Sequence, residues 1–409
     1  MRCRHCAADA NLVLVDLGSA PPSNAYLTRD ALRGPEAWWP LRVRVCERCW
    51  LAQTEDFVHA EKLFNPDYAY FSAYSRSWLE HAERYVSEMV TRFALDTGSH
   101  VLEVAANDGY LLQYVKGRGI PCTGVEPTAS TAAASRERGI PIVEAFFGVE
   151  LAKELARGGR QADLMTANNV LGHVPDINDF VRGFTVLLKP QGVVTFEFHH
   201  LKRLIDGCQF DTIYHEHFSY LSLTAVETIL AAAGLAVFDV EEHPTHGGSL
   251  RVFAQRSDTG THGRTAAVEA VLGAESMAGL RGAPYYASFQ GRSLKVKNDL
   301  LSFLLTARAE GRTVAGYGAA AKGNTLLNFA GVRQDLVAFV VDRNPAKQGK
   351  YLPGSRIPVV DEDELTKVRP DYVLILPWNL REEVMSEQAR VGEWGGRFVT
   401  AVPEIRIWP

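Results

Sequence analysis

The sequence predicts an α/β protein in which two doubly wound parallel sheets follow a small cysteine-rich domain. Three observations predict this fold. Short apolar strands alternate with helical segments between Ser99 and Glu197, a second strand–glycine loop–helix unit begins at Arg312, and two Cys-x-x-Cys pairs precede both. Strands that alternate with helices form parallel sheets with ligand sites at their carboxyl ends. We place the domains at residues 1–66, 67–255 and 256–409.

Size and composition are those of a multidomain globular protein. At 409 residues the chain is too long for one hydrophobic core. Its net charge of −5 predicts no surface for the DNA or RNA backbone, which requires clustered positive charge. We find no apolar run of the roughly 20 residues that span a bilayer, and no signal-peptide core at the N-terminus. We therefore expect a cytoplasmic protein with neither nucleic-acid nor membrane partners.

Four of the six cysteines form two close pairs: Cys3 with Cys6, and Cys46 with Cys49. Two such pairs supply four thiolates, which is a complete tetrahedral site for zinc. Because all four ligands come from the protein, this zinc is expected to be structural. Four unrelated cysteines and a redox Cys-x-x-Cys are the alternatives, but no strand precedes either pair in the thioredoxin manner. A hairpin excursion must fill the long gap between the pairs.

The first strand of the middle domain leads into a loop of small residues. Ala105, Asn107 and Gly109 let the backbone approach a ligand, and Glu103 is a carboxylate near the strand end. The next strand ends at Glu126, whose carboxylate suits the two hydroxyls of a ribose. The loop alone is a weak signal, because Ala105 replaces the first glycine of the Gly-x-Gly-x-x-Gly fingerprint.

Later segments strengthen the prediction of a nucleotide cofactor. Phe147 follows a third strand, where an aromatic ring can pack on an adenine, and a fourth strand runs through Asn168 and Asn169 toward His173. The order of these strands, with Glu126 and a Leu-Lys-Pro-x-Gly turn, resembles class I S-adenosylmethionine methyltransferases. The cofactor-binding residues predicted here are Glu103, Ala105, Asn107, Gly109, Glu126, Pro127, Phe147, Asn168 and Asn169.

Histidines are concentrated after the cofactor segment. Seven of the 12 histidines lie between His173 and His246, and the densest run is Tyr214-His-Glu216-His217. Histidine suits proton transfer near neutral pH. On an extended chain Tyr214 and His217 would face opposite ways, whereas on a helical turn they would share a face. A metal site at His215 and His217 remains an alternative, but the pair alone is incomplete.

A second glycine loop, Gly316-Tyr317-Gly318, is followed by Lys322 and Asn324 at the start of a helix. Its functional interpretation is phosphate binding at the helix N-terminus, and its bland interpretation is a tight turn that serves packing. The loop also makes a nicotinamide-dependent oxidoreductase acting on a nucleotide sugar an alternative function. A third alternative is a zinc-ribbon binding module with an inactive enzyme domain.

Several motifs follow one another along almost the full chain. They are the cysteine pairs, Glu103-Val-Ala-Ala-Asn-Asp-Gly, Ala-Asn-Asn-Val-Leu-Gly-His173, Phe-Asp-Thr-Ile-Tyr214-His-Glu-His and Thr-His246-Gly-Gly-Ser-Leu-Arg251. The whole resembles the deoxysugar C-methyltransferase family. The resemblance implies a zinc-binding domain, a Rossmann-like methyltransferase domain, and a C-terminal α/β domain that helps hold a nucleotide sugar.

The resemblance also implies residue roles. His217 matches the general base, Tyr214 and Glu216 its active-site neighbours, His173 a histidine near the substrate, and Tyr70 an aromatic lid residue. The expected substrate-binding residues are His246, Gly247, Arg251, Tyr317, Lys322 and Asn324. The implied reaction is methylation at C3 of a 4-keto-deoxysugar, carried by thymidine diphosphate, with S-adenosylmethionine as donor. The sequence does not establish an oligomeric state, and a monomer is our expectation.

The residue types agree with this chemistry. A ketone acidifies the neighbouring C–H bond, a base removes that proton, and the enolate carbon accepts the methyl group. The enzyme must supply a base, a donor to the enolate oxygen, and alignment. We expect His217 to be the base and a tyrosine or histidine to be the donor.

Overall fold

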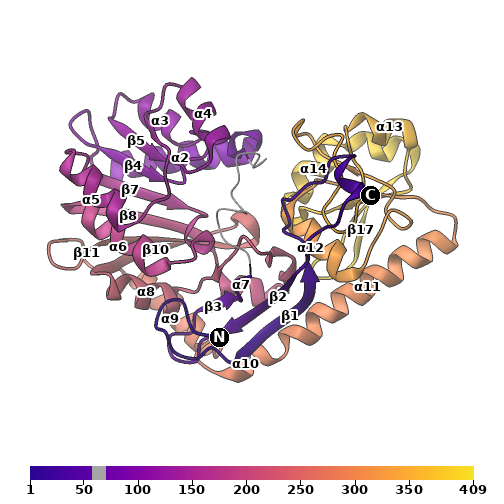
Figure 1. The fold of residues 1–409 in the computed structure, drawn as a ribbon, viewed down its shortest axis with the longest axis horizontal. Helices are drawn as coiled ribbons and strands as arrows, with labels where there is room; N and C mark the ends of the chain where they lie inside the picture. Colours follow the sequence, from indigo (N-terminus) through magenta and orange to yellow (C-terminus); the bar gives the residue numbers. More distant parts are fainter. Residues whose placement is uncertain (58–70) are drawn as a thin grey trace.

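The computed structural model describes residues 1–57 and 71–409 and confirms the predicted α/β class. In these residues the strands form sheets of four, seven and six members. Figure 1 shows the seven-stranded sheet on the left, the six-stranded sheet on the right, and the N-terminal sheet between them at the base. No helix of this part of the chain is long and apolar enough to cross a membrane.

The N-terminal sheet is antiparallel, with the order β1-β2-β3-β9. Leu41, Val43 and Val45 alternate with less buried residues along β2, which is the pattern of a strand with one buried face. The fourth strand comes from far along the chain, so the sheet joins the cysteine-rich segment to the middle of the sequence. Its strands are β1 (Leu12–Ala20), β2 (Trp39–Val45), β3 (Ala52–Thr54) and β9 (Ser219–Tyr220).

The middle sheet has the order β10-β11-β8-β7-β4-β5-β6. Its strands pair in parallel except along both sides of β11, which is antiparallel to β8 and β10. The carboxyl ends of the parallel strands therefore meet at one edge. The strands are β4 (Val101–Val104), β5 (Cys122–Val125), β6 (Ile142–Val143), β7 (Ala162–Asn168), β8 (Leu188–His199), β10 (Leu235–His243) and β11 (Ser249–Arg256).

Helices connect and cover these strands. The helix α2 begins where Ser75 accepts a hydrogen bond from the main-chain N–H of Trp78, and α6 begins at Asp176 in the same way. The helices of this region are α2 (Arg76–Arg92), α3 (Leu112–Lys116), α4 (Ala129–Glu137), α5 (Val149–Arg157), α6 (Ile177–Leu187), α7 (Leu201–Asp206) and α8 (Leu223–Ala232).

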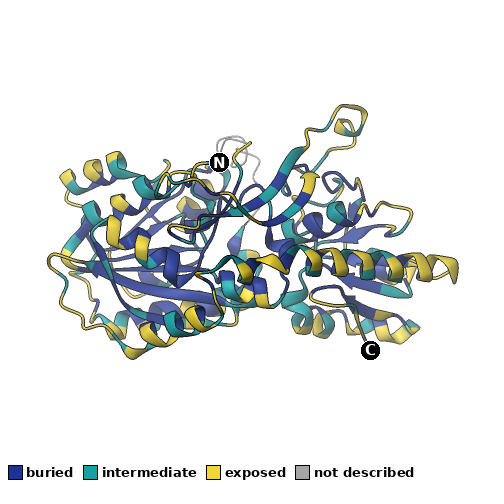
Figure 2. Cartoon of the chain, turned by 90° about the horizontal axis from the view of Figure 1, so that it is seen from below, coloured by how far each residue is buried: buried dark blue, intermediate teal, exposed yellow. Residues whose placement is uncertain are grey.

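The C-terminal sheet is parallel apart from its last strand, with the order β14-β13-β12-β15-β16-β17. Its strands are β12 (Val314–Tyr317), β13 (Val340–Val341), β14 (Val359–Val360), β15 (Tyr372–Ile375), β16 (Arg397–Thr400) and β17 (Arg406–Trp408). The helices after the middle sheet are α9 (Ala266–Met277), α10 (Ala283–Ala287), α11 (Phe289–Ala309), α12 (Ala321–Ala330), α13 (Asp363–Val368) and α14 (Arg381–Glu387). Figure 2 shows one side of α11 exposed along much of its length.

The segment between the cysteine pairs, residues 21–38, reaches across to the C-terminal domain (Figure 1). Leu27 forms a β-bridge with Tyr351, and Glu36 accepts a hydrogen bond from the main-chain N–H of Gly354. The predicted hairpin excursion is therefore present as the antiparallel pair β1–β2, and the segment that joins these two strands contacts the C-terminal domain. This segment contacts the C-terminal domain, and β9 pairs with β3 of the N-terminal domain, so contacts cross both predicted limits. The domain limits at residues 66 and 255 remain predictions.

Candidate active site

A cavity of about 450 Å³ lies at the carboxyl ends of β4, β5 and β7. Ala105 and Asn107 line it with left-handed backbone, φ 59° and 49°. Non-glycine residues rarely adopt this conformation, which turns the loop sharply beside the cavity. Of the predicted cofactor residues, the cavity lining includes Ala105, Asn107, Glu126, Pro127, Phe147, Asn168 and Asn169.

Glu126 lies on the wall of this cavity with its carboxylate fixed. Its two oxygens accept hydrogen bonds of 2.9 Å from the main-chain N–H groups of Asn107 and Thr128. Burial raises the pKa of Glu126, and these two bonds oppose that rise. A carboxylate oxygen can accept more than one hydrogen bond, so Glu126 retains acceptor capacity toward a ribose.

Two residues predicted to bind the cofactor lie behind the cavity wall. Glu103 is 1% exposed, does not line the cavity, and has its pKa raised well above the usual range by burial. Gly109 has φ 78°, and a Cβ there would lie 2.4 Å from Cδ1 of Ile140 and 2.7 Å from Oγ of Ser135 in α4. Close packing against α4 therefore explains Gly109 without a ligand.

His217 lies in a tight turn beside the cavity. The main-chain N–H of His217 donates to the carbonyl of Tyr214, which folds residues 214–217 so that the two rings lie 3.9 Å apart between centroids. This turn places Tyr214 and His217 on one face, so the turn geometry of the two predicted arrangements is correct. His173, which lines the cavity, meets the His217 ring edge to face at 4.5 Å.

The hydrogen bonds of His217 define its protonation. Its Nδ1 lies 2.8 Å from the carbonyl oxygen of Thr212, so Nδ1 must carry a hydrogen and donate it. Burial lowers the pKa of His217 well below its usual value, and the nearby His173 lowers it further. The ring is therefore neutral near pH 7, with its lone pair on Nε2. Burial similarly lowers the pKa of His173 to about 4.

Glu216, which the resemblance makes an active-site neighbour of His217, is bonded to a residue of the N-terminal domain. Both of its carboxylate oxygens lie 2.8 Å from the side-chain amide of Asn24, in the segment between the cysteine pairs. The hydrogen-bond partner of His217 Nδ1 is the carbonyl oxygen of Thr212. Tyr70 lies outside the described residues.

A second polar cluster lies between the middle sheet and the start of α12. The Lys322 ammonium is 2.6 Å from the amide oxygen of Asn379 and 4.8 Å from the Trp378 ring centroid, and its pKa is lowered by burial. Trp378 donates to Asp211, whose pKa burial raises to about 6. His246 lies near this cluster. Burial lowers the pKa of His246 to about 4, and the charge of Lys322 lowers it in the same direction.

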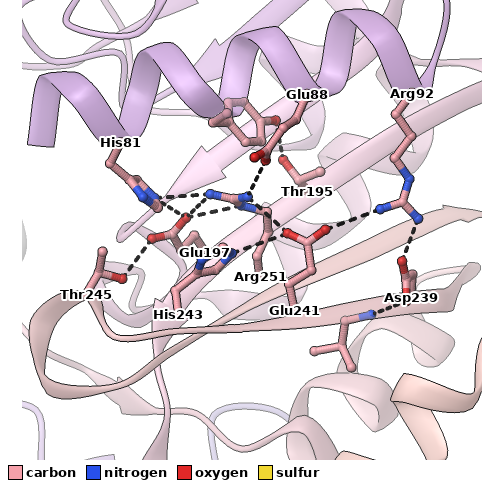
Figure 3. Close-up of polar contacts among 12 residues, drawn as sticks. His81, Glu88, Arg92, Thr195, Glu197, Asp239, Glu241, His243, Thr245 and Arg251 are labelled. Carbon is pink, nitrogen blue, oxygen red and sulfur yellow. Dashed lines mark hydrogen bonds and ion pairs between the residues drawn. The ribbon is translucent and has the colours of Figure 1, made fainter.

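Arg251 is placed differently from our prediction that it binds substrate. It is 1% exposed and lies beneath α2, where its guanidinium contacts Glu197 at 2.9 Å, Glu241 at 3.1 Å and Glu88 at 3.6 Å. Figure 3 shows this network closed around the guanidinium, with His81 also in contact. These partners use the Arg251 donors, so we correct its role to that of a structural cation.

The remaining predicted substrate residues lie in or near the C-terminal domain. The Tyr317 hydroxyl donates to Glu362 and accepts from Arg343, and the Asn324 amide donates to the carbonyl of Ser23 at 2.7 Å. A Cβ on Gly247 would lie 2.6 Å from the Trp378 ring, so glycine there permits close contact between the two domains.

A tyrosine from the N-terminal segment contacts the second glycine loop. The Tyr26 hydroxyl donates to the carbonyl of Ala319 at 2.5 Å, and Lys347 contacts both that carbonyl and Asp342. Asp342 directly follows β13, at the position where a dinucleotide fold would use an acid to bind ribose. Here that acid is already bonded to the Lys347 ammonium and to the N–H of Ala319.

The four predicted metal ligands meet at one point. The sulfur atoms of Cys3 and Cys49 are 3.5 Å apart, as are those of Cys6 and Cys46, and all four lie within 4.8 Å of one another. Disulfide sulfurs are about 2.05 Å apart, which excludes a bond here. Zn–S bonds of about 2.3 Å in a tetrahedron would separate the sulfurs by about 3.8 Å, so the site fits zinc.

Several residues of the site were missed by the sequence analysis. Trp78 and Tyr110 line the cavity, Trp378 and Asp211 belong to the Lys322 cluster, and Asn24 binds Glu216. A signal was available for Trp378, which closely follows β15 at the ligand-binding edge of a parallel sheet. No sequence signal marked Asn24, because it lies in a segment without the hydrophobic periodicity of a helix or strand.

Comparisons with known proteins match three successive parts of the chain. Three family models match: a zinc binding domain at residues 3–64, a methyltransferase domain at 78–240, and a C-methyltransferase C-terminal domain at 244–403. The chain is 35% identical over 405 residues to the C-methyltransferase NovU of Streptomyces niveus, covering 99% of this chain and 96% of that protein.

More distant similarities are confined to part of the chain. A ubiquinone biosynthesis O-methyltransferase of Chromobacterium violaceum is 32% identical over 114 residues, which are 27% of this chain and 48% of that protein. The structure of magnesium protoporphyrin IX methyltransferase from Synechocystis with bound S-adenosylmethionine matches 44% of this chain and 79% of its own, with 15% identity and a TM-score of 0.34.

Proposed function

This chain belongs to the C-methyltransferase family and uses S-adenosylmethionine and zinc, and from that premise we propose that its substrate is a nucleotide-linked 4-keto-deoxysugar methylated at C3. Thymidine diphosphate is the proposed carrier. The observation that supports this most is the bond between Nδ1 of His217 and the carbonyl of Thr212, which leaves Nε2 as the proton acceptor, beside His173 in the cavity lining.

We propose that His217 removes the proton from C3 of the sugar. Its Nδ1–H stays bonded to the carbonyl of Thr212, which holds the ring while Nε2 accepts the proton. The Tyr214 ring lies against His217, where its phenol can donate to the enolate oxygen that forms on the C4 ketone. S-adenosylmethionine, when bound, would supply an electrophilic methyl group, and Glu126 would hold its ribose.

The Lys322 cluster is the proposed site for the diphosphate. A buried ammonium gains most from an anionic partner, and Lys322 lies near His246 and Trp378 with its pKa lowered by burial. Close contact at Gly247 brings this cluster to the edge of the middle domain. A sugar between Lys322 and His217 would then lie between its carrier and the methyl donor.

The nicotinamide alternative has less support. Family membership favours methyl transfer, and Tyr26, Lys347 and Asp342 already bond to one another or to the loop that a dinucleotide would use. The alternative of an inactive enzyme domain has no support in the site, where His217 and the cavity lie together.

The test is methyl transfer to a defined sugar. Purified protein with S-adenosylmethionine and a thymidine-diphosphate 4-keto-deoxysugar should yield a product heavier by one methylene, with the new methyl group on carbon by NMR. The matched control is the same nucleotide sugar with its ketone reduced to an alcohol, which should not react because its C3 proton is not acidified. Methylation of the reduced sugar, or of an oxygen atom, would refute the proposal.

A further inference from the structure

The cysteine-rich domain contacts the catalytic turn directly. The strand β3 begins three residues after Cys49 and pairs with β9, where Ala52 lies opposite Tyr220 and Gln53 opposite Ser219. The strand β9 itself begins two residues after His217. The backbone that leads away from His217 is thus held by a strand of the zinc-binding domain.

Thr54 makes the contact nearest to His217. Its main-chain N–H donates to the carbonyl of Phe218 at 3.1 Å, and its hydroxyl donates to the carbonyl of His217 at 3.0 Å. Thr54 is 3% exposed, so water does not readily replace these bonds. One buried threonine therefore fixes two consecutive peptide groups at the base.

Arg4 extends this connection to the first cysteine pair. It lies between Cys3 and Cys6, and its guanidinium donates to the carbonyl of Thr54 at 3.1 Å while lying 5.4 Å from the Phe218 ring centroid. Its main-chain N–H donates to the side chain of Gln53 at 2.9 Å. The loop that carries two of the zinc ligands therefore contacts Gln53, Thr54 and the ring of Phe218.

We propose that Thr54 is a positioning residue that holds the main chain of His217, and that the zinc-binding domain acts on catalysis through this contact. The inference rests on the proposed role of His217 as base. The side chain of His217 is oriented by Thr212, and its main chain is held by Thr54, so the ring is fixed from two directions. Thr54 is not a lining residue of the cavity, and its hydroxyl is bonded to the main chain of His217.

The test compares Thr54→Val with Thr54→Ser. Valine keeps the shape of threonine but removes the hydroxyl, whereas serine restores it. We expect Thr54→Val to lower kcat about tenfold, because a small displacement of a base is costly to the reaction rate. KM for the nucleotide sugar, affinity for S-adenosylmethionine and zinc content should be unchanged, and Thr54→Ser should recover most of the loss.

The control is Thr185→Val. The Thr185 hydroxyl likewise donates to a main-chain carbonyl, that of Ala233, at 2.8 Å on the far side of the middle domain. This variant should retain wild-type kcat. If Thr54→Val does not fold with its zinc, Thr54→Ala removes the hydroxyl with less crowding and takes its place.

Deuterium exchange separates this inference from the proposed function. With the demethylated cofactor product and keto-sugar in deuterated water, Thr54→Val should exchange the C3 proton about tenfold more slowly than wild type, as expected for a displaced base. Normal exchange by Thr54→Val, together with lost exchange by His217→Asn, would overturn the positioning role alone. Normal exchange by His217→Asn would overturn the proposed base and this inference with it.

Discussion

His217 and His173 meet edge to face, with ring centroids 4.5 Å apart, at the border between the cofactor cavity and the turn of residues 214–217. His173 ends the loop after β7, and His217 lies just before β9, so the contact joins two separate segments. It brings the proposed base next to the proposed methyl donor.

Replacing His217 by asparagine should abolish proton removal and leave the cofactor site intact. We expect turnover to fall by roughly 10²–10⁴-fold, the usual contribution of a positioned general base. Affinity for S-adenosylmethionine, measured by calorimetry, should be unchanged, because His217 does not line the cavity. A variant that still exchanges the C3 proton with deuterated water at the normal rate would move the base elsewhere, with His173 and Tyr214 as the next candidates.

The pH dependence follows from the direction of the His217 shift. Burial lowers the pKa of His217 well below 6.5, so the neutral base form persists as the pH falls through that value. We expect kcat/KM, measured from about pH 5 to pH 8, to hold its plateau at pH 6.5 and decline only at lower pH. An acid limb at or above pH 6.5 would contradict this assignment.

Stability must be followed in the same experiment. Burial lowers the pKa of His173 and of His246 to about 4, from 6.5. Between these values the unfolded chain binds more protons than the folded one, so the free energy of unfolding decreases as the pH falls from 6.5 toward 4. Circular dichroism at each pH distinguishes this loss of structure from protonation of the base.

Glu126→Ala should weaken binding of S-adenosylmethionine. The lost charge-assisted hydrogen bonds to a ribose would cost about 1.5–3 kcal/mol, measured by calorimetry. Glu144→Ala is the matched control, since Glu144 is an exposed carboxylate that pairs with Arg136. Equal affinities for the Glu126 variant and wild type would refute the ribose assignment.

The local features of the fold followed from the sequence because they depend on neighbouring residues. The strand ends at Ala105 and Glu126 were predicted from short apolar runs followed by small or acidic residues, and the structure places both on the cavity. The cysteine pairs were predicted from spacing alone, and their sulfurs converge. In each case the residues that predicted the feature lie in one or two short segments of the sequence.

Contacts between distant segments could not be predicted in the same way. Arg251 was expected to bind substrate, but strand register places it opposite Glu241 on β10 and Glu197 on β8. Asn24 and Tyr26 lie in a segment without periodicity, and their partners are 192 and 293 residues away. Such pairings depend on register and domain packing, which a single sequence does not display.

Purified protein should contain one zinc ion per chain, bound by Cys3, Cys6, Cys46 and Cys49. Cys49→Ser should lose the metal by elemental analysis, whereas Cys122→Ser, which lies outside the cluster, should retain it. Chelation should lower the melting temperature, because metal binding contributes directly to folding of such a site. Metal-free wild-type protein, or a disulfide between these cysteines, would contradict the prediction.

The last prediction concerns Lys322 and the carrier of the sugar. The buried Lys322 ammonium has Asn379, the Trp378 ring and the charge of Asp211 around it, and burial lowers its pKa. A diphosphate would supply the anion that such a buried cation favours. Lys322→Met should therefore raise KM for the nucleotide sugar by about 10- to 100-fold, the range expected for a lost hydrogen bond to a charged group. The value of kcat should change much less, because Lys322 does not contact His217.

The effect of Lys322→Met on KM is compared with that of a second lysine variant. Lys367→Met removes an exposed lysine of the same domain, paired with Glu364, and should leave KM unchanged. Thymidine diphosphate alone should inhibit the wild type competitively and the Lys322 variant much more weakly. If the variant instead loses affinity for S-adenosylmethionine while KM for the sugar is unchanged, the diphosphate does not bind at Lys322, and the C-terminal domain contributes to the active site through packing alone.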